Sequence, residues 1–94
     1  MDDGSRRGKT RVLAVEDEPD VLRLVSWQLG SLGYEVVEAG SATEALHILS
    51  MDDNFDLLFT DVILPDDITG LELARRVRRA FGSRIKVILT SGYP

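Results

Sequence analysis

The sequence predicts an α/β domain built on a doubly wound parallel sheet. Four short apolar runs rich in strand-forming residues follow one another along the chain, at residues 11–15, 34–38, 56–60 and 85–90. Segments with apolar residues at helical spacing separate these runs. Buried strands that alternate with helices are joined by right-handed crossovers, so we expect parallel strands with helices on both faces of the sheet.

The first strand is expected to open the folded part of the chain. Residues 1–10 are polar and lack apolar periodicity, which predicts a flexible leader, with the domain over residues 11–94. Pro19 suits a first helical turn, and Gly33 ends the helix that follows. Trp27 is expected to pack at the edge of this helix, and the alternative is an exposed aromatic residue that serves a partner surface. The apolar positions of this first helix are Val21, Leu22, Val25, Leu29 and Leu32.

Two further helices are predicted between the later strands. Either Ser41 or Thr43 can cap the second helix of the chain. A loop around Pro65 leads through Gly70 into the third helix, which Gly82 ends. The apolar positions of these two helices are Ala45, Leu46 and Leu49, then Leu71, Leu73, Ala74 and Val77.

The composition excludes several classes of protein. A chain of 94 residues with 44% hydrophobic and 29% charged residues is typical of one small globular domain. The absence of cysteine excludes disulfides and thiolate metal sites. No apolar stretch resembles a membrane span or a secretory signal, so we expect no membrane association and a cytoplasmic location.

The charge balance argues against nucleic-acid binding. The formal net charge is −5 and no extended Lys/Arg-rich run is present, whereas affinity for nucleic acids depends largely on neutralising phosphates. The predicted third helix carries a basic cluster, which we interpret as a solvated face. The cluster consists of Arg75, Arg76, Arg78 and Arg79.

Acidic residues follow two of the predicted strands. Glu16 and Asp17 come after the first strand and Asp61 after the third, while Thr90 and Ser91 close the fourth. The carboxyl ends of parallel strands meet at one edge of a sheet, where ligands bind. Three carboxylates brought together repel one another unless a cation or a basic group neutralises them.

The residue types favour Mg²⁺ at this edge. All candidate ligand atoms at this edge are oxygens. We therefore predict Asp17 and Asp61 as direct ligands and Glu16 as a ligand through water. A carboxylate can also attack a phosphoryl group, so Asp61 is the candidate nucleophile. The alternative for Glu16 and Asp17 is a favourable interaction with the dipole of the following helix.

Three motifs resemble a known family, in the same order along the chain. They are Val15-Glu16-Asp17-Glu18-Pro19, the segment 56–65 around Asp61, and the segment 87–93 around Thr90 and Ser91. Over residues 11–94 the chain resembles the receiver domains of response regulators and of hybrid histidine kinases. The loop of residues 64–70 is one residue longer than in the commonest receivers, which is similar to the hybrid kinases. The fold implied is the flavodoxin-like (CheY-like) doubly wound sheet.

The resemblance implies a phosphoacceptor domain of a two-component system. Asp61 would take a phosphoryl group from a phosphohistidine on a histidine kinase or phosphotransfer protein. Mg²⁺ would be held by Asp17, Asp61 and the backbone carbonyl of Ile63, with Glu16 acting through water. Ser91 aligns best with the family's switch hydroxyl, and Thr90 is the second choice.

The sequence departs from the family pattern after its fourth strand. Complete receivers continue through a helix, a fifth strand that ends in a lysine, and a final helix, and these 94 residues hold no counterpart. The domain implied thus has about four strands and three helices. Without the lysine a cation is missing from the phosphoryl site. The alternative function is therefore a receiver-like interaction or dimerisation module, with a homodimer formed through the exposed last strand.

An enzymatic role is not predicted. An aspartate-based phosphohydrolase would use a second acid two residues after the nucleophile, and that position is Ile63.

Overall fold

The computed structural model describes residues 9–65 and 68–91. In these residues the elements are β1 (Arg11–Val15), α1 (Pro19–Ser31), β2 (Glu35–Ala39), α2 (Ala42–Met51), β3 (Leu57–Asp61), α3 (Gly70–Phe81), a 3₁₀ turn (Gly82–Arg84) and β4 (Lys86–Thr90). The alternation of strands and helices confirms the predicted order. Most of the predicted leader, residues 1–8, lies outside the described residues.

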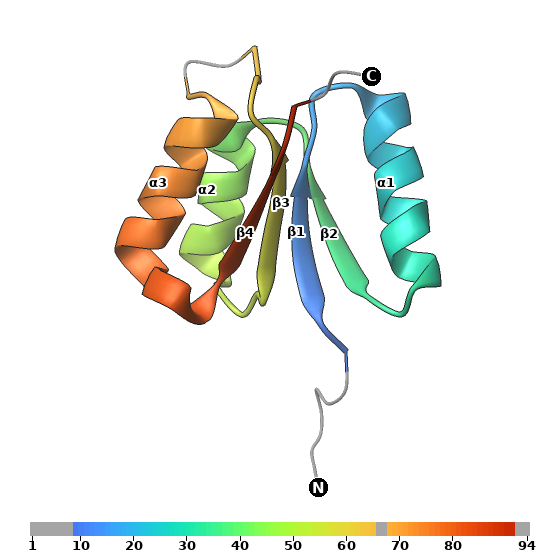
Figure 1. Ribbon diagram of the computed structural model, residues 1–94, viewed down its shortest axis with the longest axis horizontal. Coiled ribbons are helices and arrows are strands. Elements are labelled where there is room, and N and C mark those ends of the chain that lie inside the picture. Colours follow the sequence, from blue (N-terminus) through green and yellow to red (C-terminus); the bar gives the residue numbers. More distant parts are fainter. Residues whose placement is uncertain (1–8, 66–67, 92–94) are drawn as a thin grey trace, which may run out of the picture.

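The strands form one parallel sheet in the order β2-β1-β3-β4. Helix α1 covers one face, and α2 and α3 cover the other (Figure 1). The chain passes from β2 across β1 to reach β3, so the winding reverses between β1 and β3. In open α/β sheets, ligands bind beyond the carboxyl ends of the strands at such a reversal. The predicted fold class is confirmed, and the fold places a binding crevice beside the ends of β1 and β3.

The core lies mainly between the sheet and the pair α2 and α3. Strand β1 is central, and all four of its residues from Val12 to Val15 are buried. Burial on both faces explains why β1 is a continuous apolar run rather than an alternating one. The fully buried side chains of this core include Leu13, Leu58, Leu73, Val77 and Ile85.

Two helices begin with a side-chain cap that bonds an N–H of the first turn. The Ser41 hydroxyl accepts a hydrogen bond from the Glu44 N–H at 3.0 Å, and the Glu44 carboxylate accepts one from the Gly40 N–H at 2.7 Å. Of the two candidate caps, Ser41 is therefore the one that acts. Thr69 caps α3 in the same way, through the Glu72 N–H at 3.0 Å.

The prediction for Trp27 was wrong. Trp27 lies on α1 but 70% of its surface is exposed, whereas Leu22 on the same helix is buried. Five residues separate the two, and at about 100° per residue they point about 140° apart around the helix axis. Leu22 faces the sheet, so Trp27 faces away from it.

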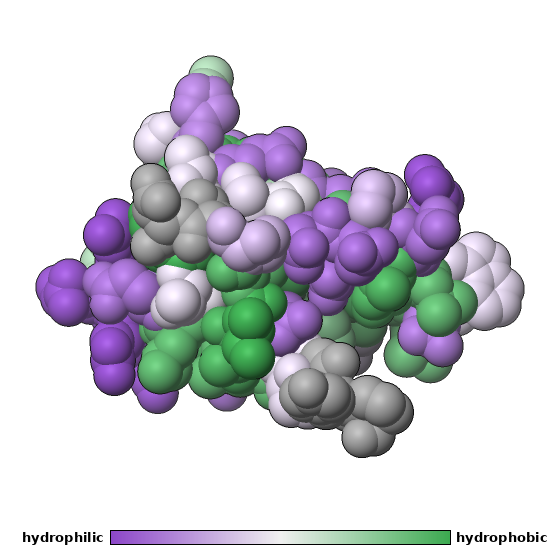
Figure 2. All heavy atoms as spheres, turned by 90° about the horizontal axis from the view of Figure 1, so that it is seen from above, coloured by the Kyte–Doolittle hydropathy of each residue, from purple (hydrophilic) through white to green (hydrophobic). Residues whose placement is uncertain are grey.

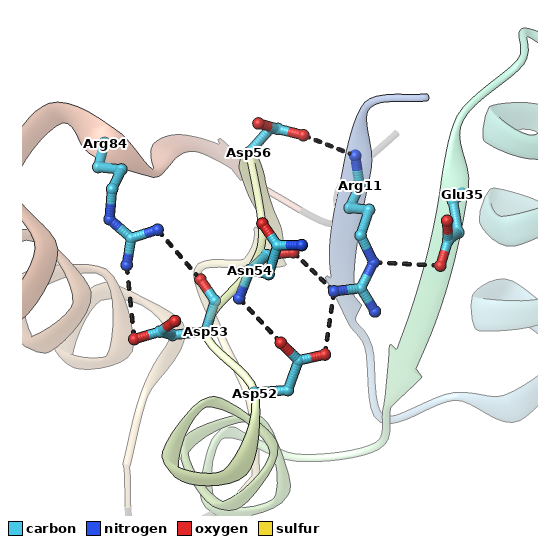
Figure 3. A network of polar contacts seen from close by, with 7 residues as sticks. All are labelled: Arg11, Glu35, Asp52, Asp53, Asn54, Asp56 and Arg84. Carbon is cyan, nitrogen blue, oxygen red and sulfur yellow. Dashed lines mark hydrogen bonds and ion pairs between the residues drawn. The ribbon is translucent and has the colours of Figure 1, made fainter. Parts of the chain in front are cut away.

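Arg11 ties together three segments at the amino ends of the strands, the edge opposite the crevice (Figure 3). Its guanidinium donates to Glu35 at 3.1 Å, to Asp52 at 3.0 Å and to the Asn54 carbonyl at 2.6 Å. It also lies 4.5 Å from the centre of the Phe55 ring. Hydrogen bonds from the Asn54 backbone and Arg11 lower the pKa of the Asp52 carboxyl. Arg11 thus joins β1 to β2 and to the loop that leads into β3.

Candidate functional site

Asp61 is the last residue of β3 and lies at the carboxyl end of the sheet. Pairing with β1 ends one residue earlier, at Val15 and Thr60, whereas pairing with β4 continues to Asp61 and Thr90. Asp61 is partly buried. It is therefore paired with β4 on one side and lies one residue beyond the pairing with β1 on the other.

Backbone hydrogen bonds fix the turn that follows Asp61. The Val62 N–H donates to the Thr90 carbonyl at 2.8 Å, and the Gly70 N–H donates to the Val62 carbonyl at 2.9 Å. The Ile63 N–H donates to Asp61 Oδ1 at 3.1 Å. This last contact holds one carboxylate oxygen, so the orientation of the carboxylate follows from the backbone of the turn.

Glu16 and Asp17 reach the same edge from the end of β1. The Glu16 N–H donates to the Ala39 carbonyl at the end of β2, at 3.1 Å. The Glu16 carboxylate accepts from the Glu18 N–H at 3.1 Å. Glu18 is the residue that precedes α1, and its own side chain makes no capping hydrogen bond. The Glu16 carboxylate thus accepts a hydrogen bond from the residue just before α1. This contact supports the helix-dipole alternative for Glu16 without excluding a role at the site.

The electrostatics show that the three acidic residues interact. Partial burial raises the pKa of the Glu16 carboxyl, and the Glu18 N–H acts in the opposite direction. Contact with Asp17 and the negative charges of Asp61 and Asp17 raise this pKa further. Glu16 therefore lies within range of the charges of both aspartates.

Glu16, Asp17 and Asp61 carry the oxygen ligands that a hard cation prefers. In the part of the chain that the structure describes, no three carboxylate, imidazole or thiol side chains are arranged ready to enclose a metal. The donors at this edge are all oxygens, however, and a divalent cation would offset the repulsion among the carboxylates, which adds to the effect of burial on the pKa of Glu16. The residues present thus fit Mg²⁺ held in part by water.

Thr90 and Ser91 lie beside this group. Thr90 is the register partner of Asp61, and Ser91 is the exposed residue that follows β4. Both residues, with Glu16, line one end of a groove of about 690 Å³ whose other walls are apolar side chains of α1 and Phe59. Seen from above, hydrophilic side chains gather over the middle of this edge (Figure 2).

Two residues near Asp61 were missed by sequence reasoning. Thr60 is fully buried, and its hydroxyl donates to the Asp61 carbonyl at 3.0 Å. Gly70 is so close to that carbonyl that a Cβ atom there would lie 1.7 Å from the oxygen. The available signals were a hydroxyl residue in an apolar strand and a glycine at the start of a helix, and neither signal specifies a partner.

The membrane expectation can be compared with the described helices. None of them is long and apolar enough to span a bilayer.

Comparison with known proteins agrees with the fold and the motifs. The family model for the response regulator receiver domain matches residues 12–94. Sensor protein EvgS of Escherichia coli O157:H7 is 43% identical over 70 residues, which cover 74% of this chain and 6% of EvgS. Sensor histidine kinase RcsC of Escherichia coli K12 is 38% identical over 68 residues, 72% of this chain and 7% of RcsC. The chain therefore spans a small part of these relatives.

Solved structures agree as well. Response regulator TrrA from Thermotoga maritima, solved in complex with Mg(2+)-BeF, superposes with a TM-score of 0.81 at 36% identity, covering 89% of this chain and 70% of that one. The receiver domain of hybrid histidine kinase CckA gives a TM-score of 0.70 at 32% identity, covering 86% of this chain and 85% of that one. The chain belongs to the response regulator receiver domain family of two-component signalling proteins.

Proposed function

We propose that the chain accepts a phosphoryl group on Asp61 from a phosphohistidine of a histidine kinase or phosphotransfer protein. An Asp61 carboxylate oxygen attacks phosphorus, and an O–P bond forms as the P–N bond breaks. The imidazole nitrogen leaves with the bonding electron pair, and the product is an aspartyl phosphate. The observation that carries the proposal is the placement of Asp61 at the sheet reversal, with its Oδ1 held by the Ile63 N–H and with Glu16 nearby.

The proposed cofactor is Mg²⁺. Asp17, Asp61 and the backbone carbonyl of Ile63 would bind it directly, and Glu16 through water. When bound, the ion neutralises charge on the transferring phosphoryl oxygens. The oxygen donor set supports this assignment, as does the complex of the similar protein TrrA with Mg(2+)-BeF.

Ser91 is the proposed switch hydroxyl that contacts the phosphoryl group, and Thr90 is the second candidate. Thr90 is the register partner of Asp61 across the β3–β4 pair, and Ser91 is the next residue along the chain. In this reading the chain has no turnover of its own and serves as a phosphoacceptor. The cytoplasmic location stays a prediction from the sequence.

Phosphorylation of the purified chain tests the proposal. Incubation with Mg²⁺ and acetyl phosphate should add one phosphoryl group to the intact mass, and chelation of Mg²⁺ should prevent the addition. Asp61→Ala should remove the adduct, while Asp53→Ala, which removes an exposed carboxylate near the opposite edge of the sheet, should keep it. A folded wild-type chain that gains no mass would contradict the proposal.

Self-association through β4 is a second proposal, because within the described residues β4 is an edge strand with exposed apolar side chains. Ile88 is 44% and Leu89 is 40% exposed. Hydrophobic surface lies along the lower side of Figure 2, which corresponds to the front of Figure 1, where β4 lies. An exposed apolar edge strand is a template for pairing with a second chain.

The 94-residue chain is therefore expected to form dimers at high concentration, measurable by multi-angle light scattering. Ile88→Lys should reduce dimerisation, because a charge on an edge strand opposes pairing. Leu32→Lys is the matched control, since Leu32 is an exposed residue just after α1. A monomeric wild-type mass at every concentration would exclude this mode of association.

A further inference from the structure

We infer that Thr60 is a positioning residue for the phosphoacceptor, acting through the peptide unit that links Asp61 to Val62. The inference rests on the proposed function of Asp61. Thr60 is the only polar residue among the described residues that is buried in the core, with 0% of its surface exposed. Its hydroxyl is directed at the Asp61 carbonyl.

The peptide unit between Asp61 and Val62 is held at both ends. Its N–H, on Val62, donates to the Thr90 carbonyl at 2.8 Å, so that end is fixed to β4. Its carbonyl oxygen, on Asp61, accepts from the Thr60 hydroxyl at 3.0 Å. Pairing with β1 stops at Thr60, so the register does not extend to Asp61 on that side. The hydroxyl of Thr60 thus holds the end of the peptide unit that lies beyond the β1 register.

The orientation of this peptide unit affects the position of the Ile63 N–H, which belongs to the next peptide unit. A change in ψ of Asp61 that an opposite change in φ of Val62 does not compensate moves the Ile63 N–H. That N–H holds Asp61 Oδ1 at 3.1 Å. Loss of the Thr60 hydroxyl should therefore loosen the carboxylate, although the hydroxyl bonds the backbone carbonyl of Asp61 and not its carboxylate.

Two substitutions separate this role from packing. Thr60→Val keeps the shape of the side chain and loses the hydroxyl, whereas Thr60→Ser keeps the hydroxyl and loses a methyl group. We expect Thr60→Val to slow phosphorylation by acetyl phosphate roughly tenfold, because small misplacements of a reacting group are costly. Thr60→Ser should stay within about twofold of the wild type, since its donor remains.

A second readout requires no phosphorylation. The Ile63 amide proton should move upfield in the ¹H–¹⁵N spectrum of Thr60→Val, because its hydrogen bond to Asp61 is weakened, and should keep its position in Thr60→Ser. Leu49→Ala is the control for lost stability, since Leu49 is buried in the last turn of α2, near the opposite edge of the sheet. That variant should leave the Ile63 resonance unchanged.

Comparison of Thr60→Val with Thr60→Ser decides between the two roles. Slow phosphorylation and a moved Ile63 resonance in Thr60→Val alone support the inference. Equal rates and resonances in both variants, or a larger loss in Thr60→Ser, would overturn it. If Thr60→Val does not fold, Thr60→Ser against Thr60→Ala makes the same comparison, since both lack the methyl group and only serine donates. A wild-type chain that accepts no phosphoryl group would refute the proposed function, and the Ile63 resonance would still decide the role of Thr60.

Discussion

Replacing Gly70 by alanine should lower the free energy of unfolding by about 3 kcal/mol, the upper part of the range for overpacked sites. A Cβ atom at this position would lie 1.7 Å from the Asp61 carbonyl oxygen and 2.7 Å from its carbon. Both are backbone atoms, so no side chain can swing aside. The first turn of α3 would have to move away from the end of β3, and Asp61 would lose its support. Urea unfolding followed by circular dichroism measures the loss.

Gly30→Ala is the matched control for Gly70→Ala. Gly30 lies in α1, and a Cβ atom there would meet nothing within 4 Å. Alanine favours a helix over glycine, so this variant should gain about 0.5 kcal/mol. Neither glycine is required for a positive φ, since among the described residues only Gly33 and Gly82 adopt one. A Gly70→Ala variant as stable as the wild type would show that α3 does not press on Asp61.

Replacing Arg11 by methionine should cost about 2 kcal/mol, the value typical of lost hydrogen bonds to a charged group. Methionine keeps an apolar stem over Phe55 but loses the contacts with Glu35, Asp52 and the Asn54 carbonyl. The Arg11 side chain is only 19% exposed, so water has little access to take the place of these hydrogen bonds in the variant. Arg11→Lys should recover little, because an ammonium group cannot reach several partners as the planar guanidinium does.

Arg23→Met tests whether any ion pair would give the same loss. Arg23 bonds Asp20 at 3.3 Å, but the two side chains are 73% and 97% exposed. Exposed pairs contribute little, so this variant should stay within about 0.5 kcal/mol of the wild type. Equal losses in Arg11→Met and Arg23→Met, measured by chemical denaturation, would mean that the Arg11 cluster is no stronger than a surface pair.

The strands and helices could be predicted because each carries its own local signal. Apolar runs predicted β1 and β3, and apolar residues at helical spacing after Pro19 predicted α1. The sequence left the cap of α2 open between Ser41 and Thr43, since both residue types cap helices. Geometry decided for Ser41, whose hydroxyl meets the Glu44 N–H. Trp27 was misplaced because the direction of a side chain around a helix depends on which stripe faces the sheet, and α1 has apolar residues on more than one side.

The acidic residues of the site could be predicted because strand ends of a parallel sheet converge. Glu16 and Asp61 are 45 residues apart in the chain, yet Glu16 follows β1, Asp61 ends β3, and β1 and β3 are neighbours. The residues that support Asp61 from behind could not be predicted. The close approach of Gly70 to the Asp61 carbonyl depends on where α3 begins relative to β3, and no local pattern encodes that distance. The Thr60 hydrogen bond depends on the orientation of one hydroxyl, which the residue type alone does not specify.

The most direct test of the central claim is to locate the phosphoryl group. After reaction with acetyl phosphate and Mg²⁺, borohydride reduces an aspartyl phosphate to homoserine, and peptide sequencing by tandem mass spectrometry finds the residue changed. We expect homoserine at position 61 and at no other aspartate, with none formed in Asp61→Asn. Modification at Asp17 or at another residue, with Asp61 intact, would contradict it.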